Sequence, residues 1–145
     1  MLEFELSRSG RTTRPFAVLL LDVDNLKKIN DRHGHLVGSR ALCRVADAMR
    51  GTCRTMDTAA RYGGDEFALI LPEIEDVAAR QVAERVAARL SGDGEQPPVS
   101  VSVGVAVYPR DGNAVEALLG SADEALYVAK AAFQGRSRLG AAGAP

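Results

Sequence analysis

Hydrophobic and polar residues follow two different periods along this chain, and the changes of period divide it into strands and helices. A continuous apolar run at residues 16–21 ends in an Asp-Val-Asp triplet at 22–24, which predicts a central strand covered on both faces. Residues 99–107 alternate strictly between valine and small residues, and predict a strand with one valine face. Residues 58–62 and 67–71 predict the two strands of a hairpin around a glycine turn.

Apolar residues at helical spacing occupy the segments between these strands. They predict helices at residues 25–31, 36–50 and 114–132, and a further helix in which apolar residues recur every four positions over 78–90. The resulting order is strand, helix, helix, strand, strand, helix, strand, helix. Because one hairpin and short crossovers connect the strands, we expect an α+β domain with a mixed, mainly antiparallel sheet flanked by helices.

Length and composition restrict the class of protein. The chain has 145 residues, 46% of them hydrophobic and 26% charged, which is typical of one folded domain. Its 18 Lys and Arg against 19 Asp and Glu give a net charge of -1, so no overall field attracts nucleic acid or membrane. We expect residues 1–15 to form an N-terminal tail or helix remnant, 16–138 the domain, and 139–145 a disordered tail.

The cysteines and apolar stretches favour a cytoplasmic protein. Cys43 and Cys53 are the two cysteines, too few for a secreted disulfide scaffold and without zinc-site spacing. Cys43 falls on the apolar side of a predicted helix, so we expect its thiol to be buried. The apolar run at 16–21 is too short to span a bilayer, and residues 1–10 have no signal-peptide pattern.

Four acidic residues are the candidate chemistry of the chain. Two glycines at 63–64 permit positive φ angles and leave backbone open to a ligand, and Asp65 and Glu66 follow them. If the first strand ends beside this turn, Asp22 and Asp24 approach these acids. Clustered carboxylates are tolerated when hard cations such as Mg²⁺ neutralise them, and two ions would support phosphoryl transfer. An ordinary hairpin with solvated acids is the alternative for the turn by itself.

Positive groups that phosphates require are also present. Lys27 and Lys130 are the candidates, and an ordinary solvated surface position is the alternative for each. The helix start near residue 25 offers backbone N–H groups as a second anion-binding element. His33 and His35 lack a third ligand and make a poor metal site.

The sequence resembles the GGDEF family, diguanylate cyclases that join two molecules of GTP into cyclic di-GMP. The matching segments are residues 21–31, 34–35, 63–67, 101–104 and 122–130. The resemblance implies a sheet of the ferredoxin-like, nucleotidyl-cyclase palm type. It also implies a homodimer, in which each domain holds one GTP, and an upstream sensor domain or partner protein, with neither nucleic acid nor membrane as a partner.

The resemblance further implies roles for individual residues. Asp22 and Asp65, with the backbone carbonyl of Val23, would hold Mg²⁺ or Mn²⁺. Asp65 or Glu66 would help to deprotonate the attacking 3′-hydroxyl. The residues implied in GTP binding are Lys27, Asn30, His35, Ser39, Gly63, Gly64 and Lys130. Arg54 and Asp57 match an RxxD motif that binds cyclic di-GMP as an inhibitor, with a surface ion pair as the alternative.

Three departures from the family pattern leave alternatives open. Ser39 stands where the family usually has an aspartate, Phe133 and Gln134 where it commonly has Gly-Arg, and its usual leading segment is not found before Phe16. We therefore carry three hypotheses. The first is an Mg²⁺-dependent diguanylate cyclase, and the second a non-catalytic module that binds GTP or cyclic di-GMP for signalling. The third is another palm-like cyclase or nucleotidyl transferase that prefers ATP.

Overall fold

Four strands form one antiparallel sheet in the computed structural model, which describes residues 14–143, with side chains to residue 135. The strands are β1 (Phe16–Val23), β2 (Thr58–Arg61), β3 (Glu66–Pro72) and β4 (Val101–Tyr108). Their order across the sheet is β2-β3-β1-β4, and every neighbouring pair is antiparallel. The central position predicted for the first strand is thus confirmed.

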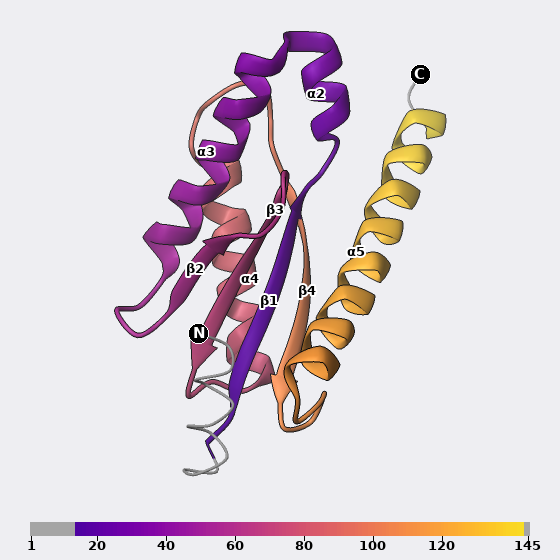
Figure 1. The fold of residues 1–145 in the computed structure, drawn as a ribbon. Coiled ribbons are helices and arrows are strands. Elements are labelled where there is room, and N and C mark those ends of the chain that lie inside the picture. The colour runs from indigo at the N-terminus through magenta and orange to yellow at the C-terminus, as the bar shows by residue number, and fades with distance from the viewer. Residues whose placement is uncertain (1–13, 144–145) are drawn as a thin grey trace.

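Helices cover both faces of the sheet (Figure 1). They are α2 (Leu26–His33), α3 (His35–Thr52), α4 (Asp76–Ser91) and α5 (Val115–Gly143). The helices α3 and α4 pack on one face and α5 on the other, while α2 follows the end of β1 (Figure 1). The α+β class and the order of elements agree with the prediction. No helix within residues 14–143 is both long enough and apolar enough to cross a membrane.

The central strand β1 separates two hydrophobic cores. All eight of its residues are buried, and their side chains alternate between the faces of the sheet. Ala17, Leu19 and Leu21 belong to the core under α3 and α4. Phe16, Val18 and Leu20 belong to the core under α5. The same alternation directs the side chain of Asp22 toward the α5 face.

The small-residue face of β4 lets α5 approach the sheet closely. A Cβ atom added at Gly104 would lie 2.1 Å from the carbonyl oxygen of Ala122 in α5, so only glycine fits there. The two-faced strand predicted from the valine alternation is confirmed, since Val105 and Val107 belong to the opposite core. This close packing brings the later turns of α5 alongside the end of β1.

Two features of the helices differ from the prediction. Cys43 is exposed, whereas the neighbouring Arg44 is buried on the inner face of α3. Arg44 is tolerated there because it donates to both carboxylate oxygens of Asp93, at 2.8 and 3.0 Å, and to the carbonyl of Pro97 at 2.6 Å. Sequence periodicity ranks arginine as a surface residue and cannot anticipate such partners.

The last helix is longer than expected. It extends to Gly143, past the predicted end at residue 132 and into the segment 139–145, for which the sequence suggests disorder. Leucine and alanine in this segment have high helix propensity. The predicted N-terminal tail lies, except for residues 14 and 15, outside the described residues.

Candidate active site

The end of β1 and the turn between β2 and β3 lie side by side at one end of the sheet (Figure 1). Asp22 is paired in register with Glu66. The backbone N–H of Val23 lies 3.4 Å from the carbonyl oxygen of Asp65, to which it donates. The antiparallel pairing of β1 with β3 therefore joins two acidic segments that are far apart in the sequence.

The turn exposes its backbone. Gly63 has a φ angle of 82°, a conformation that favours glycine. A Cβ atom added at Gly64 would meet nothing within 4 Å. The turn is closed by a hydrogen bond from the Tyr62 N–H to the Glu66 carbonyl, at 2.7 Å, and by the guanidinium of Arg61, which donates to the Gly64 carbonyl. The turn is thus fixed from within while its outer side stays open to a ligand.

The carboxylate of Asp22 has one paired and one unpaired oxygen. Its Oδ2 accepts a hydrogen bond from Lys130 Nζ on α5 at 2.7 Å. Its Oδ1 is buried and has no hydrogen-bond partner. A buried carboxylate oxygen without a partner is costly, so this atom marks a position suited to a positively charged ligand.

Burial and crowding raise the pKa values of two acids in the site. Desolvation is the largest cause for Asp22, partly offset by the hydrogen bond and charge of Lys130 and reinforced by Asp65 and Asp24. Desolvation also raises the pKa of Glu66, followed by the charges of Asp22, Asp65 and Asp123. The negative charge gathered here exceeds what Lys130 neutralises.

The donor set fits a hard divalent cation. Among the described residues no group of three or more His, Cys, Asp or Glu side chains forms a ready ligand set. Asp22 and Asp65 nevertheless offer carboxylate oxygens, and the backbone at Val23 lies against Asp65. Mg²⁺ is commonly held by one or two carboxylates while water and substrate phosphates complete its octahedron, so a partial protein ligand set suits this ion.

Asp24 lies close enough to raise the pKa of Asp22, but its carboxylate oxygens are bound on the other side of β1. Its two carboxylate oxygens accept hydrogen bonds from Ser100 Oγ at 2.7 Å and Ser102 Oγ at 2.6 Å. Both serines belong to the β4 side of β1, opposite the hairpin. In the sequence these serines are predicted only as small residues of a strand face, and nothing in the local pattern indicates that their hydroxyls fix Asp24.

Asp123 is a further acidic residue near the site that the sequence pattern did not predict. It lies on α5, seven residues before Lys130, and seven residues correspond to about two helical turns. The two side chains therefore share a face of α5, and Asp123 contributes to raising the pKa of Glu66. This spacing was the signal that could have revealed it.

The predicted guanine-binding residues lie on α2 and α3. Asn30 packs against Gly38, because a Cβ atom added at Gly38 would lie 1.7 Å from Asn30 Oδ1. Ser39 is exposed and lines a cavity of about 330 Å³. The other residues that line this cavity are Leu42, Cys43, Ala46, Met49 and Arg50 of α3 and Ala59, Ala60, Arg61 and Phe67 of the hairpin. The cavity is therefore mainly apolar with a few polar groups.

Two other predicted substrate residues are exposed without fixed partners. Lys27 is the second residue of α2 and His35 the first of α3. In the part of the chain that the structure describes, neither side chain makes a hydrogen bond or ion pair. The structure thus brings Lys130 into contact with the carboxylates and leaves Lys27 and His35 free to contact a ligand.

Arg54 and Asp57 form an ordered pair at the opposite end of the hairpin. The Asp57 carboxylate accepts from the Arg54 backbone N–H at 2.7 Å and from its guanidinium at 2.8 Å. The guanidinium also donates to the Pro72 carbonyl at 2.7 Å. Because Pro72 ends β3 and Glu66 begins it, this pair lies about 20 Å from the glycine turn. The Asp57 side chain is 2% exposed and that of Arg54 43%.

The chain matches one family model and a set of longer proteins. The family model described as "Diguanylate cyclase, GGDEF domain" matches residues 1–136. The bifunctional diguanylate cyclase/cyclic di-GMP phosphodiesterase MucR of Pseudomonas aeruginosa is 39% identical over 140 residues, which are 94% of this chain and 20% of MucR. The curated relatives are longer proteins, of which this chain spans between 20% and 38%.

Solved structures share the fold. The GGDEF domain of TpbB (YfiN) from P. aeruginosa superposes with a TM-score of 0.81 at 36% identity, over 88% of this chain and 83% of that one. The GGDEF domain of DgcB from Caulobacter crescentus, solved in complex with cyclic di-GMP, gives a TM-score of 0.81 at 26% identity, over 90% and 81%. The antiparallel sheet and its helices therefore match those of GGDEF domains.

Proposed function

Because the chain belongs to the GGDEF domain family, we propose that it is a diguanylate cyclase domain, which condenses two molecules of GTP into cyclic di-GMP and releases pyrophosphate. One observation carries the proposal: the Oδ1 of Asp22 is buried and unpartnered, and the pKa values of Asp22 and of its neighbour Glu66 are both raised. Such groups are concentrated at functional sites. A purely structural carboxylate would have both oxygens satisfied, as Asp24 has.

In this proposal Asp22, Asp65 and the Val23 carbonyl hold Mg²⁺ or Mn²⁺. When bound, the cation supplies positive charge that offsets the charge developing on the phosphate oxygens. The roles of the protein residues follow from their positions. Lys130, already adjacent to Asp22, contributes a second positive charge near the triphosphate, and Lys27 a third. Gly63 and Gly64 let the nucleotide approach the backbone of the turn.

Glu66 is suited to accept the proton of the attacking hydroxyl, with Asp65 as the alternative. A general base works best when its pKa is closer to the operating pH, and the pKa of Glu66 is raised. The 3′-oxygen of one GTP forms a bond to the α-phosphorus of the other. The bond to pyrophosphate breaks as the proton passes to the carboxylate, and a second, symmetric transfer closes the ring.

Guanine recognition is assigned to Asn30, His35 and Ser39. An amide offers both a donor and an acceptor and so matches the guanine edge, and the contact of Asn30 with Gly38 gives that amide a defined place. Serine at position 39 offers a neutral hydroxyl in place of a charged acceptor. We therefore expect weaker GTP binding than an aspartate at this position would give.

Two copies of the domain must face each other in this mechanism, since each provides one GTP. We propose that the catalytic species is a homodimer in the cytoplasm, where GTP is available. An upstream sensor domain or partner protein would control its assembly.

The test is chromatographic detection of cyclic di-GMP from GTP and Mg²⁺ at several protein concentrations. We expect product that rises more steeply than protein concentration, because two domains meet to react, and none from an Asp65→Ala variant. A linear dependence with a monomeric protein would contradict the dimer mechanism. A folded protein that binds GTP and forms no product would overturn the cyclase proposal, and preferred use of ATP would point to another cyclase.

A non-catalytic module that binds cyclic di-GMP is the second candidate, favoured by Arg54. Its guanidinium is oriented by the buried Asp57 and yet half exposed, which suits it to contact a phosphate while Asp57 positions it. Calorimetric titration with cyclic di-GMP should show binding that Arg54→Ala abolishes. The exposed Arg50, which pairs with Asp47, provides the matched control, and unchanged binding in Arg54→Ala would exclude this site.

A further inference from the structure

A cavity of about 580 Å³ lies between α2 and the loop that joins α4 to β4. Its walls are formed by α2 residues, by the loop at residues 93–100 and by Phe133 of α5. The lining includes none of the residues assigned above to cation, GTP or product binding, namely Asp22, Val23, Lys27, Asn30, His35, Arg54, Asp57, Ser39, the turn at 63–66 and Lys130. The proposed function therefore leaves this cavity unused.

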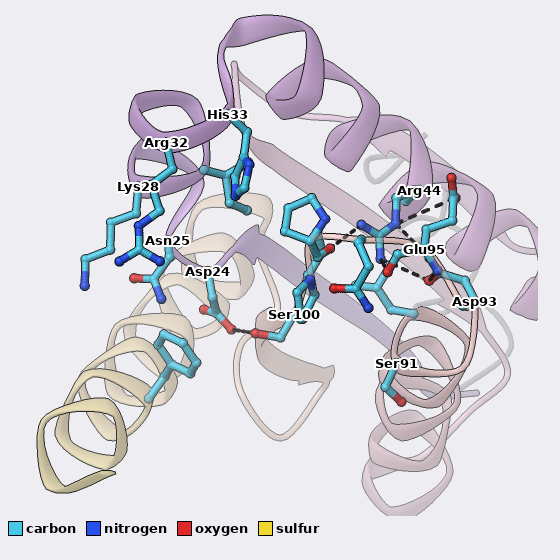
Figure 2. A pocket seen from close by; sticks show the side chains of 18 residues that line it. Asp24, Asn25, Lys28, Arg32, His33, Arg44, Ser91, Asp93, Glu95 and Ser100 are labelled. Atoms are coloured by element: carbon cyan, nitrogen blue, oxygen red, sulfur yellow. Dashed lines mark hydrogen bonds and ion pairs between the residues drawn. The ribbon is translucent and has the colours of Figure 1, made fainter. Parts of the chain in front are cut away.

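The acidic groups on one side of the cavity are already engaged. Asp93 receives two hydrogen bonds from Arg44, and Glu95 receives two from the guanidinium of Arg40, that from Nε at 2.9 Å. The cluster of Arg44, Asp93 and Glu95 forms one side of the view in Figure 2. Asp24 accepts the serine hydroxyls described above. These carboxylates therefore have few free acceptor positions directed into the cavity.

The opposite wall carries basic groups without partners. Lys28 and Arg32 come from α2, one turn apart, and lie side by side with Asn25 (Figure 2). Within the described part of the chain, neither makes an ion pair or hydrogen bond, and the side chain of Asn25 makes no capping bond to α2. His33, at the end of the same helix, also lines the cavity and adds an imidazole ring.

This arrangement weakens the helix that carries it. Like charges four residues apart repel on a helix surface, and α2 has only eight residues and no acid in its first turn. Arg32 lies in the last turn of α2, where the helix dipole favours a cation, whereas Lys28 lies in the first turn, where the dipole disfavours one. A residue that costs local stability is expected at functional sites.

An apolar floor completes the cavity. Ile29, Leu90 and Val99 are 8%, 2% and 5% exposed, and Pro97, Pro98 and Phe133 line the cavity beside them. Prolines and an aromatic ring form flat, rigid surfaces on which a planar ring can pack. The volume lies in the range of small-molecule sites.

We propose that this cavity binds a phosphorylated small molecule with a planar ring, of mononucleotide size. The phosphate lies between Lys28 and Arg32, with Asn25 as a neutral donor, and the ring packs on Phe133 and the prolines. Two cations one helical turn apart match the several acceptor oxygens of a phosphate. The cavity is thus a second ligand site, separate from the acids at the glycine turn.

Calorimetric titration of the full chain with AMP, in EDTA, tests the proposal. AMP is the probe because its adenine base does not match a guanine-selective site and EDTA removes the cation from the acidic site. We expect saturable binding that a Lys28→Gln, Arg32→Gln double variant weakens about tenfold or more, since two charge-assisted contacts are lost. Arg85→Gln removes an exposed cation outside the cavity and should leave the affinity unchanged.

Two further arms separate the phosphate from the ring. Inorganic phosphate should bind more weakly than AMP and should be weakened by the double variant, whereas Phe133→Leu should weaken AMP and leave phosphate unaffected. No binding of AMP at millimolar concentration, or equal affinity in the double variant, would overturn the proposal. Loss of AMP binding in Lys27→Gln, with the double variant unaffected, would place the ligand at the acidic site. These outcomes do not depend on whether the chain makes cyclic di-GMP.

Discussion

Lys130 Nζ lies 2.7 Å from Asp22 Oδ2, although 108 residues separate them in the chain. The contact joins the last helix to the central strand at the end of the sheet where the acids gather. Lys130 thereby neutralises part of the charge of a carboxylate whose second oxygen is unpartnered. This pair is the link between the packing of α5 and the chemistry of the site.

Replacing Lys130 with methionine should change both the stability of the fold and the activity of the site. The pKa of Asp22 should rise further, because Lys130 is what lowers it, and breaking the pair should cost about 1–3 kcal/mol of stability, less than a fully buried pair because Lys130 is 32% exposed. Cyclic di-GMP formation should fall at least tenfold, since one phosphate-facing charge is lost. Unfolding curves measure the loss of stability, and product chromatography measures turnover. Unchanged turnover would contradict the proposed contact of Lys130 with the phosphates.

The pKa of Glu66 predicts a stability that depends on pH. A carboxyl whose folded pKa is raised favours folding most when protonated, below its ordinary pKa of about 4, and that contribution is lost as pH rises through the folded pKa. Glu66→Gln, which mimics the protonated form, should therefore raise the Tm at pH 8 in EDTA, by an amount that shrinks toward pH 4. The same variant should lower turnover by about 10²–10⁴-fold. A Tm gain independent of pH would show that the raised pKa of Glu66 is not the cause of the stabilisation.

Gly38→Ala should act on the nucleotide site through Asn30. The added Cβ would lie 1.7 Å from Asn30 Oδ1, and the amide must move because it is the end of a flexible side chain. We expect the KM for GTP to rise about tenfold, by the loss of hydrogen bonds to guanine, with little change in Tm. Gly120→Ala is the control, because a Cβ there meets nothing within 4 Å. An unchanged KM would show that Asn30 does not read the base.

Arg44 should prove far more important for stability than an exposed arginine of the same helix. Its side chain is 5% exposed and that of its partner Asp93 23%, so Arg44→Ala leaves a partly buried carboxylate and the Pro97 carbonyl without a donor. We expect a loss of about 2–4 kcal/mol. Arg50→Ala breaks a pair that is 71% and 74% exposed and should change stability by less than about 1 kcal/mol. Urea unfolding compares the two, and similar losses would refute the distinction.

The sequence was informative where a feature is local. The apolar run of β1, the valine alternation of β4 and the glycine turn at 63–64 each carry a periodicity or a backbone requirement that neighbouring residues express. The membership of Asp22, Asp65 and Glu66 in one acidic group was also expected, because they lie at ends of strands that a hairpin and a crossover bring together.

The tertiary structure decided which side chains meet. Asp24 and Asp22 are two residues apart, yet the first bonds to Ser100 and Ser102 and the second to Lys130. Arg44 is buried and Cys43 exposed on the same helix, because Asp93 and the Pro97 carbonyl reach only one of them. Hydrogen-bond and ion-pair partners come from segments that sequence patterns do not relate. The sequence thus determined the elements and the acids of the site, whereas long-range packing decided how each charge is satisfied.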